Sequence, residues 1–284
     1  MVKVFEEKFP AGTQGTKKAG MYIDGALKSN LDVMKKALKE DWDGLVIVDG
    51  PEGAGKSVLT QQCAFYCDPT LNVSRIVFRP DEFEKAVLTA EKYQAIIFDE
   101  AFSGLASRKT MSTINYSIVS MLAEIRQKNL FIFIVMPSFF DMDKYVALWR
   151  SRCLLHVYAD KFKRGFFRFY NYKKKKDMYV KGKKYYSYTC VQADFYGRFT
   201  NFYPCGKEEY KKKKENSLRS YLRQPRDTKL SLKREIYTDI IKRMQNNQVM
   251  KLNNNQIAEL TGLCRQTVSK YSKPGLKVNG GDIL

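Results

Sequence analysis

The chain has 284 residues and a mass of 33.0 kDa, enough for one α/β domain with one or two small additions. Hydrophobic residues make up 44% of the sequence and aromatic residues 13%, which argues against a disordered chain. The longest apolar run, Leu130 to Met136, is far shorter than the roughly 20 residues that a membrane-spanning helix needs. We therefore expect no membrane contact.

The cysteines and the N-terminal residues indicate the compartment. The N-terminus is charged and has no apolar stretch of the kind found in secretion signals. Six cysteines in a chain of this length do not form a disulfide framework, so we expect reduced thiols in a bacterial, archaeal or virus-infected host cytoplasm. Zinc is not expected, because His156 is the only histidine and Cys63 and Cys67 fit a hydrophobic core.

The net charge of +20 is unevenly distributed. Residues 1–160 carry 20 Lys/Arg and 20 Asp/Glu, residues 161–233 carry 22 and 6, and residues 234–284 carry 8 and 4. A dense run of basic residues is either a solvated lysine-rich surface or a surface that binds a polyanion through counterion release.

A glycine-rich motif follows the first strongly apolar segment. Leu45–Val48 predicts a buried strand, and it leads into Gly50–Ser57, which matches G-x-x-x-x-G-K-[ST]. Glycines in this pattern let backbone N–H groups wrap a phosphate at a helix N-terminus. Lys56 would reach the β- and γ-phosphates of ATP, and the Ser57 hydroxyl would hold Mg²⁺. The predicted nucleotide-binding residues are Gly50, Pro51, Glu52, Gly53, Ala54, Gly55, Lys56, Ser57, Val58 and Asp99.

A second apolar strand, Ala95–Phe98, ends in the acids Asp99 and Glu100. Asp99 would orient Mg²⁺ through its water shell, which makes Ser57 and Asp99 the predicted metal site. Glu100 is placed to polarise the attacking water. A strand that ends in two acids is common, and it becomes specific only beside the upstream glycine-rich motif.

Strands and helices alternate through this half of the chain. Further predicted elements are a strand at Arg75–Arg79, a helix at Pro80–Lys92, a helix at Thr110–Lys128, a strand at Leu130–Met136, a helix at Phe140–Trp149 and a strand at Cys153–Tyr158. Five strands that alternate with helices predict a parallel sheet covered on both faces. The expected fold class is therefore α/β, a P-loop NTPase with a five-stranded parallel sheet.

An inserted strand between the two motifs, together with Glu100, resembles the additional-strand catalytic-glutamate (ASCE) division of P-loop ATPases. That division includes FtsK/HerA-type motors, phage DNA-packaging ATPases and Zot-like proteins, and the resemblance covers about residues 40–160. It implies ATP hydrolysis, a ring of subunits and an arginine supplied by a neighbouring subunit. Arg126 is the first candidate, followed by Arg150 and Arg152, and each could equally form a surface salt bridge. Ser138 is either a γ-phosphate sensor or a helix cap.

The basic middle of the chain, Lys161 to about Arg226, is rich in aromatic residues. Phe166–Tyr172, Met178–Val180 and Tyr185–Val191 predict β-hairpins, and residues 206–232 predict a polar linker. Lysines beside aromatic side chains suit nucleic-acid binding, and a plain β-extension packed on the ATPase core is the alternative. The acids here are too sparse to suggest a nuclease.

The C-terminal segment resembles the helix-turn-helix family in spacing. After an amphipathic helix at Leu230–Asn247, Ala258 lies where two helices would cross, Gly262 at the turn and Val268 in the second helix. In that family the second helix enters the DNA major groove. The predicted DNA-binding residues are Arg265, Gln266, Thr267, Ser269 and Lys270. A helical hairpin for protein contacts is the alternative.

These signals predict three regions: an ATPase domain at 1–160, a basic aromatic β-rich extension and linker at 161–227, and a small all-α helix-turn-helix domain at 228–284. The favoured function is a DNA-dependent ATPase, a ring-forming motor that translocates or packages double-stranded DNA. The alternative is an ATP-controlled DNA-binding switch or a replication helicase loader. A small-molecule kinase fits the Asp99–Glu100 pair and the DNA-binding tail less well.

Overall fold

The computed structural model describes residues 2–99, 108–223, 252–261 and 264–272. The chain divides into two compact units, Met1–Tyr221 and Leu222–Leu284, which we describe separately. Residues 161–221 therefore belong to the same unit as residues 1–160.

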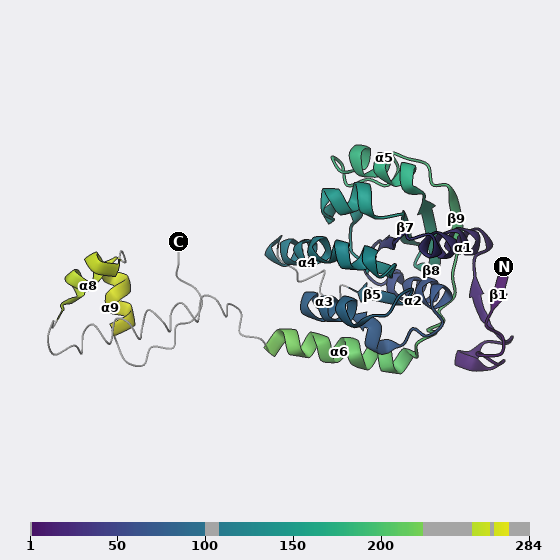
Figure 1. Cartoon of the computed structure of the whole chain (residues 1–284), viewed down its shortest axis with the longest axis horizontal. Coiled ribbons are helices and arrows are strands. Elements are labelled where there is room, and N and C mark those ends of the chain that lie inside the picture. The colour runs from purple at the N-terminus through teal and green to yellow at the C-terminus, as the bar shows by residue number, and fades with distance from the viewer. Residues whose placement is uncertain (1, 100–107, 224–251, 262–263, 273–284) are drawn as a thin grey trace. The chain divides into compact units, whose positions relative to one another are not determined.

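The first unit is built on a seven-stranded sheet in the order β4-β5-β6-β3-β7-β8-β9 (Figure 1). The strands are β3 (Gly44–Asp49), β4 (Ile76–Val77), β5 (Ala95–Asp99), β6 (Phe131–Val135), β7 (Cys153–Asp160), β8 (Lys163–Tyr170) and β9 (Phe195–Arg198). Pairing is parallel from β4 to β7 and antiparallel from β7 to β9. The five parallel strands agree with the expectation, and two antiparallel strands extend them.

This mixed α/β architecture is compatible with a P-loop NTPase fold. The strand between β3 and β5 in the sheet is β6, whereas β4, which separates the two motifs along the chain, lies at the sheet edge. A separate antiparallel pair, β1 (Val2–Val4) and β2 (Met21–Ile23), precedes the main sheet.

Helices cover both faces of the sheet (Figure 1). They are α1 (Gly25–Lys39), α2 (Lys56–Cys67), α3 (Pro80–Thr89), α4 (Arg108–Gln127), α5 (Tyr172–Gly182) and α6 (Lys207–Arg223). Short 3₁₀ turns lie at η1 (Thr13–Gly15), η2 (Val73–Arg75) and η3 (Phe139–Asp141), and a π-helical turn at η4 (Val146–Arg150). α3 begins with proline and two acids, as the sequence predicts.

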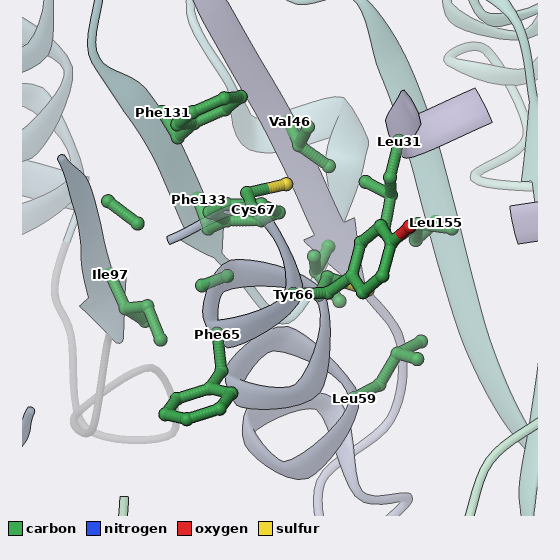
Figure 2. Packing of buried hydrophobic residues seen from close by; sticks show 14 of the residues in the cluster. Leu31, Val46, Leu59, Phe65, Tyr66, Cys67, Ile97, Phe131, Phe133 and Leu155 are labelled. Atoms are coloured by element: carbon green, nitrogen blue, oxygen red, sulfur yellow. The ribbon is translucent and has the colours of Figure 1, made fainter. Parts of the chain in front are cut away.

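Alternate residues of the central strands point to opposite faces, which creates two cores. In β3, Val46 and Val48 pack on the α1–α2 side, whereas Leu45 and Ile47 pack on the α3–α4 side. Figure 2 shows the first core, where α2 side chains such as Phe65 lie beneath the strands. Neighbouring residues of a central strand therefore contact different helical layers, one on each face of the sheet. Cys63 and Cys67 are buried in the first core, as expected.

The expectation of β-hairpins through Val191 is wrong after Tyr170, because residues 172–182 form the helix α5. The Asn171 side chain caps this helix by accepting hydrogen bonds from the backbone N–H groups of Lys173 and Lys174. The buried residues of α5 are Lys175, Met178, Tyr179 and Gly182. That spacing is helical, but the hydrophobic pattern of the sequence does not reveal it, because one buried position is a lysine.

The expected linker at 206–232 is also wrong over its first part, because Lys207–Arg223 form α6. Gly206 precedes the helix at φ 89°, and Glu208 and Glu209 lie in the first turn, where acids favour a helix. Tyr210 and Ser217 are buried. This segment therefore packs on the first unit as a helix.

The helix expected at Phe140–Trp149 is interrupted. Met142 is extended, at φ −66° and ψ 146°, so η3 ends there. Asp143 then starts a new turn, since its carboxylate accepts hydrogen bonds from the backbone N–H groups of Tyr145 and Val146. The helix expected at Leu230–Asn247 lies outside the described residues.

In the second unit, two short helices are described, α8 (Asn254–Thr261) and α9 (Arg265–Ser272). They contact each other through Ile257 and Val268, both 0% exposed, with Leu252 and Ala258 packed beside them. This is the pair of helices for which the sequence predicts a helix-turn-helix, but Gly262 at the expected turn lies outside the described residues.

Within the four described ranges, no helix combines the length and apolar character that a membrane span requires.

Lys175 allows a test of this packing through the pH dependence of stability. Its ammonium is fully buried and donates to the carbonyl oxygens of Ala147 and Leu148, at 2.6 and 3.2 Å. Burial, with smaller contributions from Lys176 and Arg152, lowers the pKa of Lys175 to about 7. Above pH 7 the unfolded chain binds a proton that the folded chain lacks, so stability should rise with pH up to the unfolded pKa.

We expect the free energy of unfolding of the wild type to rise by about 1 kcal/mol per pH unit relative to Lys175→Met between pH 7 and 9. Urea unfolding at several pH values measures this difference. Lys173→Met, which changes an exposed lysine of the same helix, is the control. Parallel curves for the wild type and Lys175→Met would contradict the assignment.

Candidate functional site

The glycine-rich loop lies between β3 and α2, at the carboxyl edge of the parallel strands. Gly50, Gly53 and Gly55 all have positive φ, at 136°, 75° and 103°. A Cβ on Gly50 would lie 2.0 Å from the carbonyl oxygen of Val157 on β7, so a larger residue cannot replace this glycine without moving that strand. The loop therefore has the backbone that a phosphate cradle needs, followed directly by a helix N-terminus.

Lys56 is folded back over its own loop. Its ammonium donates to the carbonyl oxygens of Gly50 and Pro51, at 2.6 and 3.0 Å. Burial lowers the pKa of Lys56, while the charges of Asp99, Asp49 and Glu52 act in the opposite direction. Among the described residues, the ammonium thus bonds only neutral carbonyls, partners that a phosphate oxygen could replace, and Asp99 is the first of the charges that act on it.

Ser57 and Asp99 converge on one point. Asp99 ends β5 and is 2% exposed. Its carboxylate accepts a 2.6 Å hydrogen bond from the hydroxyl of Tyr210, and the Ser57 side chain lies beside the same phenol oxygen. Burial, followed by the charge of Asp99, raises the pKa of Tyr210, so the phenol remains protonated. A hydroxyl and a carboxylate aimed at a common oxygen form a donor set that suits Mg²⁺.

A buried acid behind the loop was missed by sequence reasoning. Asp49 is 0% exposed and directly precedes Gly50. One of its oxygens lies 2.9 Å from His156 Nδ1, and the other accepts hydrogen bonds from the Phe139 N–H and the Tyr188 hydroxyl. The ring of Tyr188 stacks on that of His156, with centroids 3.9 Å apart. Asp49 therefore connects the loop to β7, η3 and the segment after α5.

An acid at the end of an apolar strand was the available signal for Asp49, as it was for Asp99. Its partners gave no signal, because Phe139, His156 and Tyr188 are 90 to 139 residues away in sequence.

The segment after β9 covers the loop and α2. The Phe199 ring is so close to Gly55 that an added Cβ there would lie 3.0 Å from it. Gln62 on α2 donates to the carbonyl oxygens of Thr200 and Phe202, at 2.6 and 2.8 Å. On the side of β8, a Cβ on Gly53 would lie 3.7 Å from the guanidinium of Arg164. Arg164 is a cation beside the loop that the sequence analysis did not single out.

The three arginines expected to act at a neighbouring site lie elsewhere. Arg126 is exposed near the end of α4, just before Leu130, whose carbonyl accepts from Gly44 at the start of β3. Arg150 and Arg152 both form ion pairs with Asp43, which also precedes β3. All three therefore lie towards the edge of the sheet opposite the glycine-rich loop.

Two further expected residues have different outcomes. Ser138 caps η3 by accepting a 3.3 Å hydrogen bond from the Phe140 N–H, so it has the helix-cap role that the sequence left open. Glu100, the expected residue for polarising water, lies outside the described residues.

In the second unit, Arg265 and Gln266 are exposed at the start of α9, and Ser269 is half-buried. The side chains of Thr267 and Lys270 lie outside the described set. The described helix start thus presents two of the five residues expected to contact DNA.

No protein-family model and no curated protein matches the chain. Among solved structures, the chain is similar to the replication initiator DnaA bound to AMPPCP and single-stranded DNA, with 11% identity, a TM-score of 0.32 and coverage of 84% of this chain and 85% of that chain. A similarity at this TM-score establishes neither fold nor function, so the function must be inferred from the chain's own residues.

Proposed function

We propose that this chain is a Mg²⁺-dependent ATP hydrolase that acts on DNA. ATP binding is supported above all by one observation: the side chains of Lys56, Ser57 and Asp99 lie together beside a loop with three glycines at positive φ. A strand–loop–helix with this sequence at the carboxyl edge of a parallel sheet suits the binding of a nucleotide's phosphates.

The chain's own groups have separate roles in binding. The loop N–H groups and the N-terminus of α2 hold the phosphates, and Lys56 exchanges its bonds to Gly50 and Pro51 for phosphate oxygens. Ser57 and Asp99 would hold the metal, Asp99 through water. Bound Mg²⁺ supplies positive charge that neutralises the phosphate oxygens.

For hydrolysis, we assign Glu100 to orient and polarise the attacking water, because it directly follows Asp99 in the chain. Arg126 is proposed as the transition-state arginine of a neighbouring subunit in a ring. Its position supports action in trans only, since it lies towards the opposite edge of its own sheet.

DNA is proposed to contact the chain at two places. The first is α9, where Arg265 and Gln266 can pair with base edges and Thr267, Ser269 and Lys270 complete the surface. We retain residues 228–284 as the proposed helix-turn-helix unit.

The second proposed DNA contact is the exposed face around α5. There the Lys176 ammonium lies 3.7 and 4.2 Å from the ring centroids of Trp149 and Tyr172, and both rings are exposed. Further exposed residues of α5 and of the segment directly after it are Lys173, Lys181, Lys183, Lys184, Tyr185 and Tyr186. Lysines interleaved with exposed rings suit a phosphate backbone and stacked bases.

The favoured activity is that of a ring-forming motor that translocates or packages double-stranded DNA, as the ASCE resemblance implies. A DNA-bound switch or helicase loader with slow turnover is the second candidate. It is favoured by the hydrogen bond that Tyr210 donates to Asp99, because this bond competes with a metal for the carboxylate.

Lys56→Ala tests the nucleotide site. The substitution removes the ammonium assigned to the β- and γ-phosphates, so ATP affinity should fall by about 1.5–3 kcal/mol. Titration of a fluorescent ATP analogue with Mg²⁺ measures it. Lys85→Ala, at an exposed lysine of α3, is the matched control and should bind like the wild type. Equal affinities for the wild type and Lys56→Ala would remove Lys56 from the site.

Steady-state ATP hydrolysis with and without duplex and single-stranded DNA tests the motor. We expect strong stimulation by duplex DNA, and a loss of about 100-fold or more in Glu100→Gln. Glu91→Gln, at an exposed acid before β5, should retain activity. Weak turnover that is indifferent to DNA would favour the switch or loader, and full activity in Glu100→Gln would refute its assignment.

Arg265→Ala tests α9. A base contact from this exposed side chain should contribute about 1–3 kcal/mol, so duplex affinity should fall by that amount in a fluorescence anisotropy titration. Glu259→Gln, on the exposed part of α8, is the control that should not weaken binding. Unchanged affinity in Arg265→Ala would favour the protein-contact alternative for these helices.

A further inference from the structure

Tyr210 of α6 contacts Asp99 in the nucleotide site, although the two residues are 111 positions apart in sequence. Its hydroxyl donates to an oxygen of Asp99 at 2.6 Å and lies beside the Ser57 side chain. Lys214, one turn further along α6, lies 3.3 Å from the same phenol oxygen. The basic helix thus places one hydroxyl and one ammonium at the point that the proposed function assigns to the metal.

The phenol and the metal compete for the same partners. Mg²⁺ takes six oxygen ligands at about 2.1 Å and retains several waters, so its hydration shell needs the space around Ser57 and Asp99. A phenol oxygen that is bonded to Asp99 and lies beside Ser57 occupies that space. Lys214 also supplies the positive charge that the buried Asp99 would otherwise receive from the metal.

The phenol cannot leave by a simple side-chain rotation into solvent, because its ring is buried. Tyr210 is 4% exposed, and its ring packs against those of Phe78 and Tyr203, with centroids 6.1 and 5.8 Å away. On the next turn, Lys213 donates to the carbonyl oxygens of Val73, Ser74 and Ile76 at 2.8, 3.0 and 2.6 Å. Displacement of the hydroxyl therefore requires movement of α6 or of the rings beside it.

We propose that the Tyr210 hydroxyl occupies the metal position of the nucleotide site and that Mg²⁺·ATP must displace it. α6, which carries Tyr210, would then move when the nucleotide site is occupied. This rests on the proposed function, because it needs Ser57 and Asp99 to hold the metal. α6 ends at Arg223, next to the boundary between the two units.

The first test compares Mg²⁺ affinities in Tyr210→Phe, which keeps the buried ring and removes the hydroxyl. Mg²⁺ is titrated into protein saturated with a fluorescent, non-hydrolysable ATP analogue, and analogue binding in EDTA gives the baseline. We expect Tyr210→Phe to bind Mg²⁺ about tenfold more tightly than the wild type, because one competing hydrogen bond to a charged group is gone. Tyr203→Phe, which alters the adjacent ring, should match the wild type.

An unchanged or weaker Mg²⁺ affinity in Tyr210→Phe would overturn the proposal, since the hydroxyl would then be neutral or a helper in metal binding. A wild type that does not bind the analogue with or without Mg²⁺ would instead overturn the nucleotide site itself. The two failures are therefore distinguishable.

The second test uses the wild-type chain and does not depend on the folding of a variant. Hydrogen–deuterium exchange over residues 207–219 should accelerate severalfold when the analogue and Mg²⁺ are both present, and should not change with the analogue in EDTA. α5 provides the internal reference within the same protein. Equal exchange of α6 in the two conditions would show that the helix does not respond to the metal and would overturn the proposal.

Discussion

The arrangement of the site depends on the parallel pairing of β3, β5, β6 and β7 in a sheet buried on both faces. Parallel strands direct all their carboxyl ends to one edge, so Asp49 and Asp99 reach the same side although they are 50 residues apart. The glycine-rich loop begins at that edge because β3 ends there. The sheet therefore brings together binding groups from two motifs that are far apart in the sequence.

Burial of two acids at this edge imposes a second requirement. A carboxylate without solvent is stable only if hydrogen-bond donors surround it. Asp49 obtains them from His156, Phe139 and Tyr188, and Asp99 obtains one from Tyr210. Both tyrosines come from the basic part of the chain. The chain after residue 160 is thus an integral part of the site, which explains why no unit boundary falls there.

The core strands, the loop and α3 were predictable, because apolar runs, glycine spacing and helix-start residues are local signals. α5 and α6 were missed for a shared reason: buried lysines look like solvent-facing residues in sequence. Lys175 and Lys213 each use a buried or half-buried ammonium to bond backbone carbonyls, which no periodicity of hydrophobic residues reveals. The partners of Asp49 and Asp99 were unpredictable, since they depend on how distant segments pack.

The excess of lysine and arginine over acidic residues therefore has two roles, bonding inside the protein and binding at its surface, which composition alone cannot distinguish. Part of it is internal: Lys56, Lys175 and Lys213 bond carbonyl oxygens, and Lys214 lies at the Tyr210 hydroxyl. These ammonium groups are committed to the fold or to the nucleotide site and cannot bind a polyanion at the same time. The exposed set on α5, such as Lys173 and Lys181, retains that capacity. A count of charges consequently overstates the surface available to DNA. Among the described residues of the first unit, the exposed lysines beside exposed rings are the ones that support that partner.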